Sequence, residues 1–199
     1  YKKHVDYNGP AILASAKVSD AALRLYAAGR ALAIELLGWI ERELPTEVSA
    51  GFSMPLAQML EGSHRTMLRI LRYPPLGGHE PEDAVRAAAH EDIDLLTVLP
   101  ASEEPGLELL DRDGTWHTVP SALGTIAVNA GDMLSEITAG RIRSPPPRVI
   151  NRAGVGGYSI PFFFDTDFDA GFGFTPGINA GAFLLAKFHK FYNNCKELI

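Results

Sequence analysis

Beyond residue 65 the chain is a succession of short apolar runs, each four to eight residues long and bounded by glycine, proline or aspartate. Runs of this length are typical of β-strands, because helices need longer periodic stretches. The expected strands cover residues 66–73, 93–99, 107–110, 115–119, 125–129, 148–151 and 158–164. Asp113-Gly114 lies between two of these runs and favours a tight turn, so a hairpin is expected over residues 107–119. Many short strands at this spacing predict a sandwich or a barrel.

Helical patterns flank the strand-rich region. Residues 20–44 carry apolar side chains at three- and four-residue spacing, with Pro45 directly after them, and predict an amphipathic helix. Other helices are expected from Ser53 to near Gly62, over 84–89, from Gly131 onward and over 180–199. The expected fold is therefore mainly β with flanking helices, in a single domain. Residues 1–65 are expected to form a mainly helical support, 66–170 the β core and 180–199 a closing helix.

Composition narrows the range of partners. The chain has 18 Lys and Arg against 24 Asp and Glu, a net charge of −6, so binding to nucleic-acid phosphates is not expected. No stretch approaches the ~20 apolar residues that a membrane span requires, so no membrane association is expected. The one cysteine, Cys195, excludes an intramolecular disulfide and favours a reducing, cytoplasmic setting.

The most suggestive candidate site is His90-Glu91-Asp92, just before the strand expected over residues 93–99. Side chains along a strand alternate between faces, so His90 and Asp92 are expected on one side, where both could bind one cation. The same spacing fits two solvated polar residues at the edge of a strand, because a His-x-Asp match arises easily by chance. The motif by itself leaves both interpretations open.

Several short motifs occur in a distinctive order around His90. They are Arg72-Tyr73-Pro74-Pro75, Ala89-His90-Glu91-Asp92, Leu95-Leu96-Thr97, Asn129-Ala130-Gly131-Asp132-Met133-Leu134, Ser144 with Arg148-Val149, and Ser159-Ile160-Pro161-Phe162-Phe163. This series closely resembles the isopenicillin-N-synthase-like branch of the Fe(II)/2-oxoglutarate-dependent oxygenases, over roughly residues 66–170. The resemblance implies a double-stranded β-helix, or jelly roll, with helices packed outside. Since the chain begins with Tyr1 rather than methionine, an N-terminal part of that fold could be missing.

The resemblance also implies an iron site. The family holds Fe(II) with two histidines and one carboxylate, and His90 and Asp92 match the first two ligands. The position of the second histidine is occupied by Pro147, which has no metal-binding side chain. No other histidine of the chain is expected to replace it; the candidates considered are His64, His117 and His189.

A second departure concerns 2-oxoglutarate. Family members that use it hold its far carboxylate with a tyrosine and an Arg-x-Ser pair. Tyr73 and Ser159 match this pattern, whereas the arginine position reads Gly157. A charged hydrogen bond contributes about 1.5–3 kcal/mol, so this loss is expected to weaken 2-oxoglutarate binding about tenfold to a hundredfold.

The function implied by the resemblance is a non-haem iron oxygenase that couples 2-oxoglutarate decarboxylation to oxidation of a small organic molecule by O₂. Two alternatives stay open. A catalytically silent member would keep the fold as a binding module or as a module that stabilises a protein partner, because Pro147 and Gly157 replace groups that catalysis uses. A third possibility is an oxygenase whose substrate itself binds the iron, which fits the missing arginine but not the missing histidine.

Overall fold

The computed structural model describes residues 3–7, 20–61, 63–75, 85–102, 105–150, 156–170 and 179–196 of the 199-residue chain. The strands are β1 (Lys3–Tyr7), β2 (Met67–Tyr73), β3 (Leu96–Pro100), β4 (Leu107–Leu110), β5 (Trp116–Thr118), β6 (Ile126–Ala130), β7 (Pro147–Val149), β8 (Gly157–Ser159) and β9 (Phe162–Phe164). The helices are α2 (Asp20–Glu43), α3 (Thr46–Ser49), α4 (Leu56–Glu61), α5 (Asp132–Ile137) and α6 (Ala180–Lys196).

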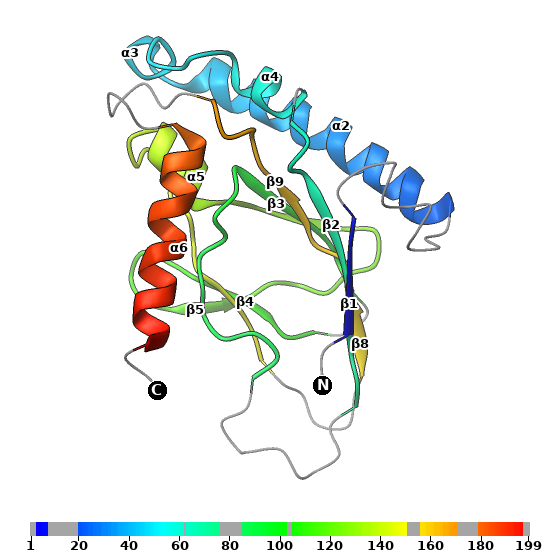
Figure 1. Cartoon of the computed structure of the whole chain (residues 1–199). Helices are drawn as coiled ribbons and strands as arrows, with labels where there is room; N and C mark the ends of the chain where they lie inside the picture. Colours follow the sequence, from blue (N-terminus) through cyan, green and yellow to red (C-terminus); the bar gives the residue numbers. More distant parts are fainter. Residues whose placement is uncertain are drawn as a thin grey trace.

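Two antiparallel sheets form the centre of the described fold (Figure 1). The larger sheet has the strand order β1-β2-β9-β3-β6, with β8 also pairing with β2, and the smaller sheet has the order β5-β4-β7. Helix α2 runs along the outside of the larger sheet, and α5 and α6 lie together at one end of the molecule (Figure 1). The expected mainly β fold with flanking helices is confirmed.

Helix α2 covers the core with one narrow face. Its buried residues are Ala22, Gly29, Ala33 and Leu37, which recur at helical spacing. A Cβ atom at Gly29 would lie only 2.9 Å from Cε1 of Phe162, so the glycine lets the helix approach β9 closely. Phe162 is fully buried and its ring stacks on that of Phe164 with centroids 5.8 Å apart. The position of α2 therefore depends on a small residue of the helix, Gly29, which packs against a large residue of the sheet, Phe162.

The hairpin expected over residues 107–119 is confirmed, because β4 and β5 pair in antiparallel register. The Oδ1 atom of Asp111 accepts the main-chain N–H groups of Asp113 and Thr115, which closes the turn. Gly114 has a φ of 81°, a conformation in which a side chain would be strained. Asp111 and Gly114 therefore stabilise the turn, and both lie within the hairpin itself.

The single strand expected over residues 158–164 is instead two strands, β8 and β9. Both pair antiparallel with β2, and Tyr73 lies opposite Gly157. Pro161 lies between them and has no N–H to donate to the ladder, which interrupts the strand. Its carbonyl oxygen still accepts the N–H of Arg69 at 2.9 Å.

The expectation of a helix at 84–89 was wrong for the part of it that the structure describes. Residues 85–90 form no helix, and Ala87 makes an antiparallel bridge with Val149. The three consecutive alanines favour a helix, but the main-chain hydrogen bonds that this segment makes with β7 stabilise the extended conformation more. The strand expected from residue 93 likewise begins only at Leu96, so His90 and Asp92 lie in an irregular segment before it.

The support expected over residues 1–65 contains α2, α3 and α4 and also a strand. Strand β1 pairs antiparallel with β2 over all five of its residues, from Lys3 opposite Arg72 to Tyr7 opposite Leu68. Strand β1 has only five residues, and the alternation of Val5 and Tyr7 with polar residues is too short to predict a strand. It lies at the edge of the larger sheet (Figure 1).

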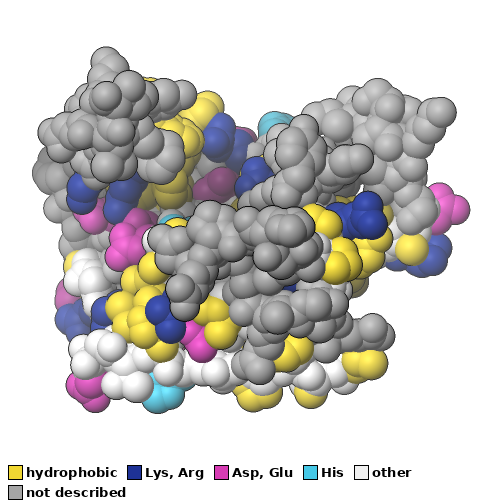
Figure 2. Space-filling view, turned by 90° about the horizontal axis from the view of Figure 1, so that it is seen from below, with side chains coloured by type: hydrophobic (Ala, Val, Ile, Leu, Met, Phe, Trp, Pro, Cys, Tyr) yellow, Lys and Arg dark blue, Asp and Glu magenta, His cyan; other side chains and the backbone are white. Residues whose placement is uncertain are grey.

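None of the helices in the described part of the chain is both long and apolar enough to cross a membrane. Seen from below in Figure 2, the Lys and Arg side chains are interspersed with those of Asp and Glu. Hydrophobic side chains gather between them. The described charges on this face therefore create a mixed electrostatic surface.

Candidate functional site

The segment that carries His90 and Asp92 is fixed by the start of helix α5. The first N–H groups of that helix donate to carbonyl oxygens within residues 92–95. These bonds run from Gly131 to Leu95, from Asp132 to Asp92 and from Met133 to Asp94, at 2.7 to 3.2 Å. N–H groups at a helix start have no partner inside the helix. Here the carbonyl oxygens of the irregular segment accept their hydrogen bonds.

The imidazole of His90 is held in one tautomer. Its Nδ1 atom lies 2.8 Å from the carbonyl oxygen of Ala88, which can only accept, so Nδ1 carries a proton and donates it. In the neutral ring the lone pair is then on Nε2, which lies 3.4 Å from Oδ1 of Asp92. Metal–ligand bonds of about 2.0–2.2 Å at right angles put two ligand atoms about 3 Å apart. The two atoms are therefore close to the spacing that one shared cation requires.

The carboxylate of Asp92 is buried and oriented by its neighbours. Its Oδ2 accepts the hydroxyl of Thr97 at 2.7 Å and the side-chain amide of Asn129 at 3.0 Å. Burial alone raises the pKa of Asp92, but its interactions with His90, Asn129 and Thr97 outweigh burial and hold that pKa below its ordinary value. Asp92 is therefore negatively charged, as a metal-binding carboxylate must be.

A second buried carboxyl, Asp94, completes this network. Oγ1 of Thr97 also lies 3.0 Å from Oδ2 of Asp94, although a hydroxyl has only one proton to donate. Burial, with the nearby charges of Asp92 and Asp165, raises the pKa of Asp94 well above its ordinary value. Thr97 therefore lies between two buried carboxyl groups, of which Asp94 holds its proton more tightly than an ordinary aspartate.

Pro147 lies beside His90, since the main-chain N–H of His90 donates to the carbonyl oxygen of Pro147 at 3.2 Å. A proline supplies no side-chain ligand at this point. Among the residues that the structure describes, no group of three or more His, Cys, Asp or Glu side chains is placed to hold a metal ion. The residues present therefore fit two of the three protein ligands of an iron triad. His117 pairs with Asp111 on the hairpin instead.

The pairing of β2 with β8 brings Tyr73 and Ser159 onto one face of the sheet. Tyr73 lies opposite Gly157, and Ser159 is two residues further along β8, so the two side chains are diagonal neighbours. Burial raises the pKa of Tyr73, and the charges of Arg86 and Arg69 lower it by less. The hydroxyl of Tyr73 therefore keeps its proton and can donate to a carboxylate.

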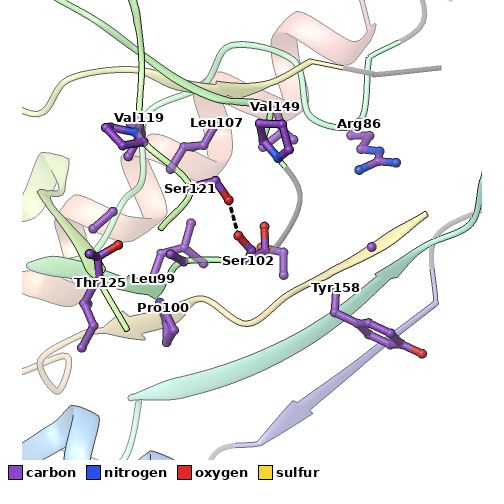
Figure 3. Close-up of a pocket in the computed structure, with 18 of the residues that line it drawn as sticks. Arg86, Leu99, Pro100, Ser102, Leu107, Val119, Ser121, Thr125, Val149 and Tyr158 are labelled. Atoms are coloured by element: carbon purple, nitrogen blue, oxygen red, sulfur yellow. Dashed lines mark hydrogen bonds between the residues drawn. The ribbon is translucent and has the colours of Figure 1, made fainter. Parts of the chain in front are cut away.

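A cavity of about 280 Å³ is lined by Tyr73, Gly157 and Ser159 together with residues of both sheets. Figure 3 shows Leu99 and Leu107 among the apolar side chains of its walls. The Ser121 hydroxyl donates to the carbonyl oxygen of Ser102 at its rim (Figure 3). The described lining does not include His90 or Asp92, so the expected metal ligands and the expected 2-oxoglutarate residues form two separate groups, both next to β7.

Sequence reasoning missed Thr97, Asn129 and Arg86 as site residues. Thr97 and Asn129 occur within the ordered motifs, but their role depends on the pairing of β3 with β6, in which they lie opposite each other. Arg86 also lines the cavity. A helix over 84–89, as the sequence suggested, would have directed it elsewhere, so only the extended path of this segment reveals it.

Several known proteins are similar to this chain in sequence. Relatives include a 2-oxoglutarate-Fe(II) type oxidoreductase, hxnY, of Emericella nidulans, 40% identical over 123 residues, or 61% of this chain and 34% of the relative. Clavatol oxidase claD of Penicillium crustosum is 38% identical over 109 residues, or 52% of this chain and 32% of the relative. The chain therefore spans about one third of the length of these curated relatives.

The fold is similar to that of a Shewanella oneidensis protein assigned as an oxygenase. The two sequences are 38% identical. The crystal structure of that protein matches this fold with a TM-score of 0.82, over 96% of this chain and 71% of that chain. The two antiparallel sheets with helices outside are therefore the expected jelly roll. The family model of the 2OG-Fe(II) oxygenase superfamily matches residues 65–166, just over half of the chain. With this match and the jelly roll in agreement, the chain belongs to the 2OG-Fe(II) oxygenase superfamily.

Proposed function

We infer that this chain acts as an Fe(II)/2-oxoglutarate-dependent oxygenase on a small organic molecule. The observation that carries this function is the pairing of Nε2 of His90 with Oδ1 of Asp92, 3.4 Å apart, inside the region that the family model matches. The names of the relatives, a 2-oxoglutarate-Fe(II) oxidoreductase and a clavatol oxidase, support the cosubstrate and the small-molecule class. Bound Fe(II) and 2-oxoglutarate would supply the oxidising chemistry with O₂.

In this function His90 and Asp92 bind the metal, and the chain prepares both of them. The carbonyl oxygen of Ala88 accepts Nδ1–H of His90 and thereby directs the lone pair of Nε2 to the metal. Thr97 and Asn129 occupy Oδ2 of Asp92, which leaves Oδ1 for the metal. Because neighbouring groups hold both side chains by hydrogen bonds, metal binding would require little rearrangement.

The other half of the site orients 2-oxoglutarate. Tyr73 and Ser159 offer two hydroxyl groups on one sheet face, and both can donate to the far carboxylate. The apolar walls of the cavity keep water away from the bound molecule, which strengthens these hydrogen bonds.

Iron binding is expected to be weak, because position 147 holds a proline. Removing a group that only orients a metal ligand already costs 10- to 100-fold in metal affinity, so the loss of a ligating imidazole costs at least about as much. A silent module that binds a small molecule or a protein partner without turnover is the second candidate function. Its support is the same proline and the lack of a three-ligand group among the described side chains.

An anaerobic titration with Fe(II) and 2-oxoglutarate distinguishes the two functions. The chelated complex produces a weak visible charge-transfer band, which we expect from the unmodified chain at high Fe(II) concentration. His90→Ala should abolish the band, while His117→Ala is a matched control because His117 is another histidine paired with an aspartate. If the unmodified chain gives no band at any Fe(II) concentration, the silent module becomes the better function.

We also infer a reducing, cytoplasmic setting. Its support is the single cysteine, Cys195, in the 199-residue chain. The Fe(II) state that the proposed function uses is favoured in the same environment.

A further inference from the structure

The cavity beside Tyr73 and Ser159 contains a positive charge from a residue outside the ordered motifs. Arg86 lines this cavity, and it carries the only formal charge among the lining residues that the structure describes. The remaining lining residues are apolar or neutral. A largely apolar cavity with one guanidinium is well suited to a small ligand that carries a carboxylate, because the guanidinium fork matches the two carboxylate oxygens.

Arg86 lies next to the tyrosine of the expected 2-oxoglutarate site. Its Cζ atom is 5.2 Å from the centre of the Tyr73 ring. Gly157 stands opposite Tyr73 in β8, so a side chain at position 157 would project from the same face, beside the same ring. The guanidinium of Arg86 therefore reaches the ring that an arginine at position 157 would also reach, and Gly157 has no side chain to compete with it.

The main chain fixes Arg86 relative to His90. The N–H of Arg86 donates to the carbonyl oxygen of Val149 at 3.0 Å, and the N–H of His90 donates to that of Pro147 at 3.2 Å. The two points of attachment are two residues apart on β7, or about 7 Å along a strand. The segment that carries Arg86 and the segment that carries His90 are therefore both held to the same short strand. Figure 3 shows Arg86 beside Val149 at the cavity.

We propose that Arg86 binds the far carboxylate of 2-oxoglutarate, together with Tyr73 and Ser159, and so replaces the arginine that is absent at position 157. This inference rests on the proposed function. A guanidinium has five N–H donors in a fixed fork, which matches the two oxygens of a carboxylate. The affinity lost through Gly157 is then largely regained from the irregular segment that precedes β3.

Calorimetric titration of the whole chain with 2-oxoglutarate tests this inference without turnover. The titration is run anaerobically with Mn(II) as a metal that does not support the oxidation. Arg86→Gln should weaken 2-oxoglutarate binding about tenfold to a hundredfold, the equivalent of one charged hydrogen bond. Arg86→Lys should weaken it less, because lysine keeps the charge and loses the fork. Arg141→Gln is the matched control, since Arg141 is an exposed arginine paired with Glu47.

A rescue experiment provides an independent readout. Gly157→Arg in the Arg86→Gln chain returns a guanidinium beside Tyr73, and recovery of the 2-oxoglutarate affinity supports the inference. Thermal unfolding of each variant is measured alongside. If Arg86→Gln does not fold, the 2-oxoglutarate affinity of Arg86→Lys is compared with that of the unmodified chain instead. Equal affinity of the Arg86 variants and the unmodified chain overturns the role of Arg86 and leaves 2-oxoglutarate use intact. If the unmodified chain binds no 2-oxoglutarate, the proposed function fails and the role of Arg86 with it.

Discussion

The main-chain N–H of His90 donates to the carbonyl oxygen of Pro147, and this bond joins the segment that carries His90 and Asp92 to the start of β7. The contact uses only main-chain atoms of both residues, so a different side chain at position 147 would keep it. Pro147 is buried, and the resemblance to the family places the second histidine at this position. A histidine at position 147 would therefore keep the main-chain contact with His90.

Pro147→His is expected to raise the affinity for Mn(II) at least about tenfold, because it adds a third ligand beside His90 and Asp92. Titration followed by the electron paramagnetic resonance signal of free Mn(II) measures this affinity. Thr118→His, which adds a histidine on an exposed part of β5, is the control and should change nothing. An unmodified chain isolated with one tightly held iron would contradict the expectation and point to a different third ligand.

Thr97→Val is expected to lower Mn(II) affinity about tenfold or more, because Thr97 orients Asp92 and a group of this kind contributes 10- to 100-fold. It should also destabilise the fold by about 1–3 kcal/mol, since two buried carboxyl groups lose the hydroxyl between them. Urea unfolding and the Mn(II) titration measure the two effects. Thr118→Val on exposed β5 is the matched control. Unchanged affinity in Thr97→Val would show that Asp92 is not held by this bond.

Gly131→Ala is expected to destabilise the fold by about 2–3 kcal/mol or more, because the new Cβ would lie 2.0 Å from the carbonyl oxygen of Asp94. The clash would push α5 away from the segment that carries Asp92. Gly38→Ala is the matched control: nothing lies within 4 Å of a Cβ there, and alanine is the better helix former by about 1 kcal/mol. Urea unfolding should therefore show opposite signs for the two variants, and equal signs would contradict this.

Asp165→Asn is expected to change how stability depends on pH. Burial raises the pKa of Asp165 to about 6, against a smaller lowering by Arg65. The folded state therefore binds this proton more tightly than the unfolded state, whose pKa is near 3.8. Stability contributed by this group is present below about pH 4 and is lost as the pH rises to about 6, by up to about 3 kcal/mol.

The Asn variant removes that loss, so it should gain stability at pH 7 relative to the unmodified chain and match it more closely at pH 4. Urea unfolding at a series of pH values between 4 and 7.5 measures the difference. The nearby Asp94 titrates in the same direction, so some decline with pH should remain in the variant. If both chains show the same slope between pH 4 and 6, Asp165 is not the group responsible.

Features with local causes were predictable from the sequence. The spacing of apolar residues gave the extent of α2 to within one residue, because a helix pattern repeats within a single segment. Asp113-Gly114 predicted the hairpin. Its turn is closed by main-chain N–H groups that donate to the side chain of nearby Asp111. The resemblance placed Pro147 at the position of a metal ligand that would share a cation with His90, and a main-chain hydrogen bond joins these two residues.

By itself the sequence determined the mainly β fold with flanking helices, the family, and the absence of a histidine at position 147 and an arginine at position 157. Tertiary structure decided which groups surround these positions. The pKa of Asp94 is raised by burial and by the nearby charges of Asp92 and Asp165, and Arg86 lies beside Tyr73 because residues 85–90 run along β7 instead of forming a helix. Burial and pairing between distant strands depend on the whole fold, so no pattern within one segment of the sequence records them.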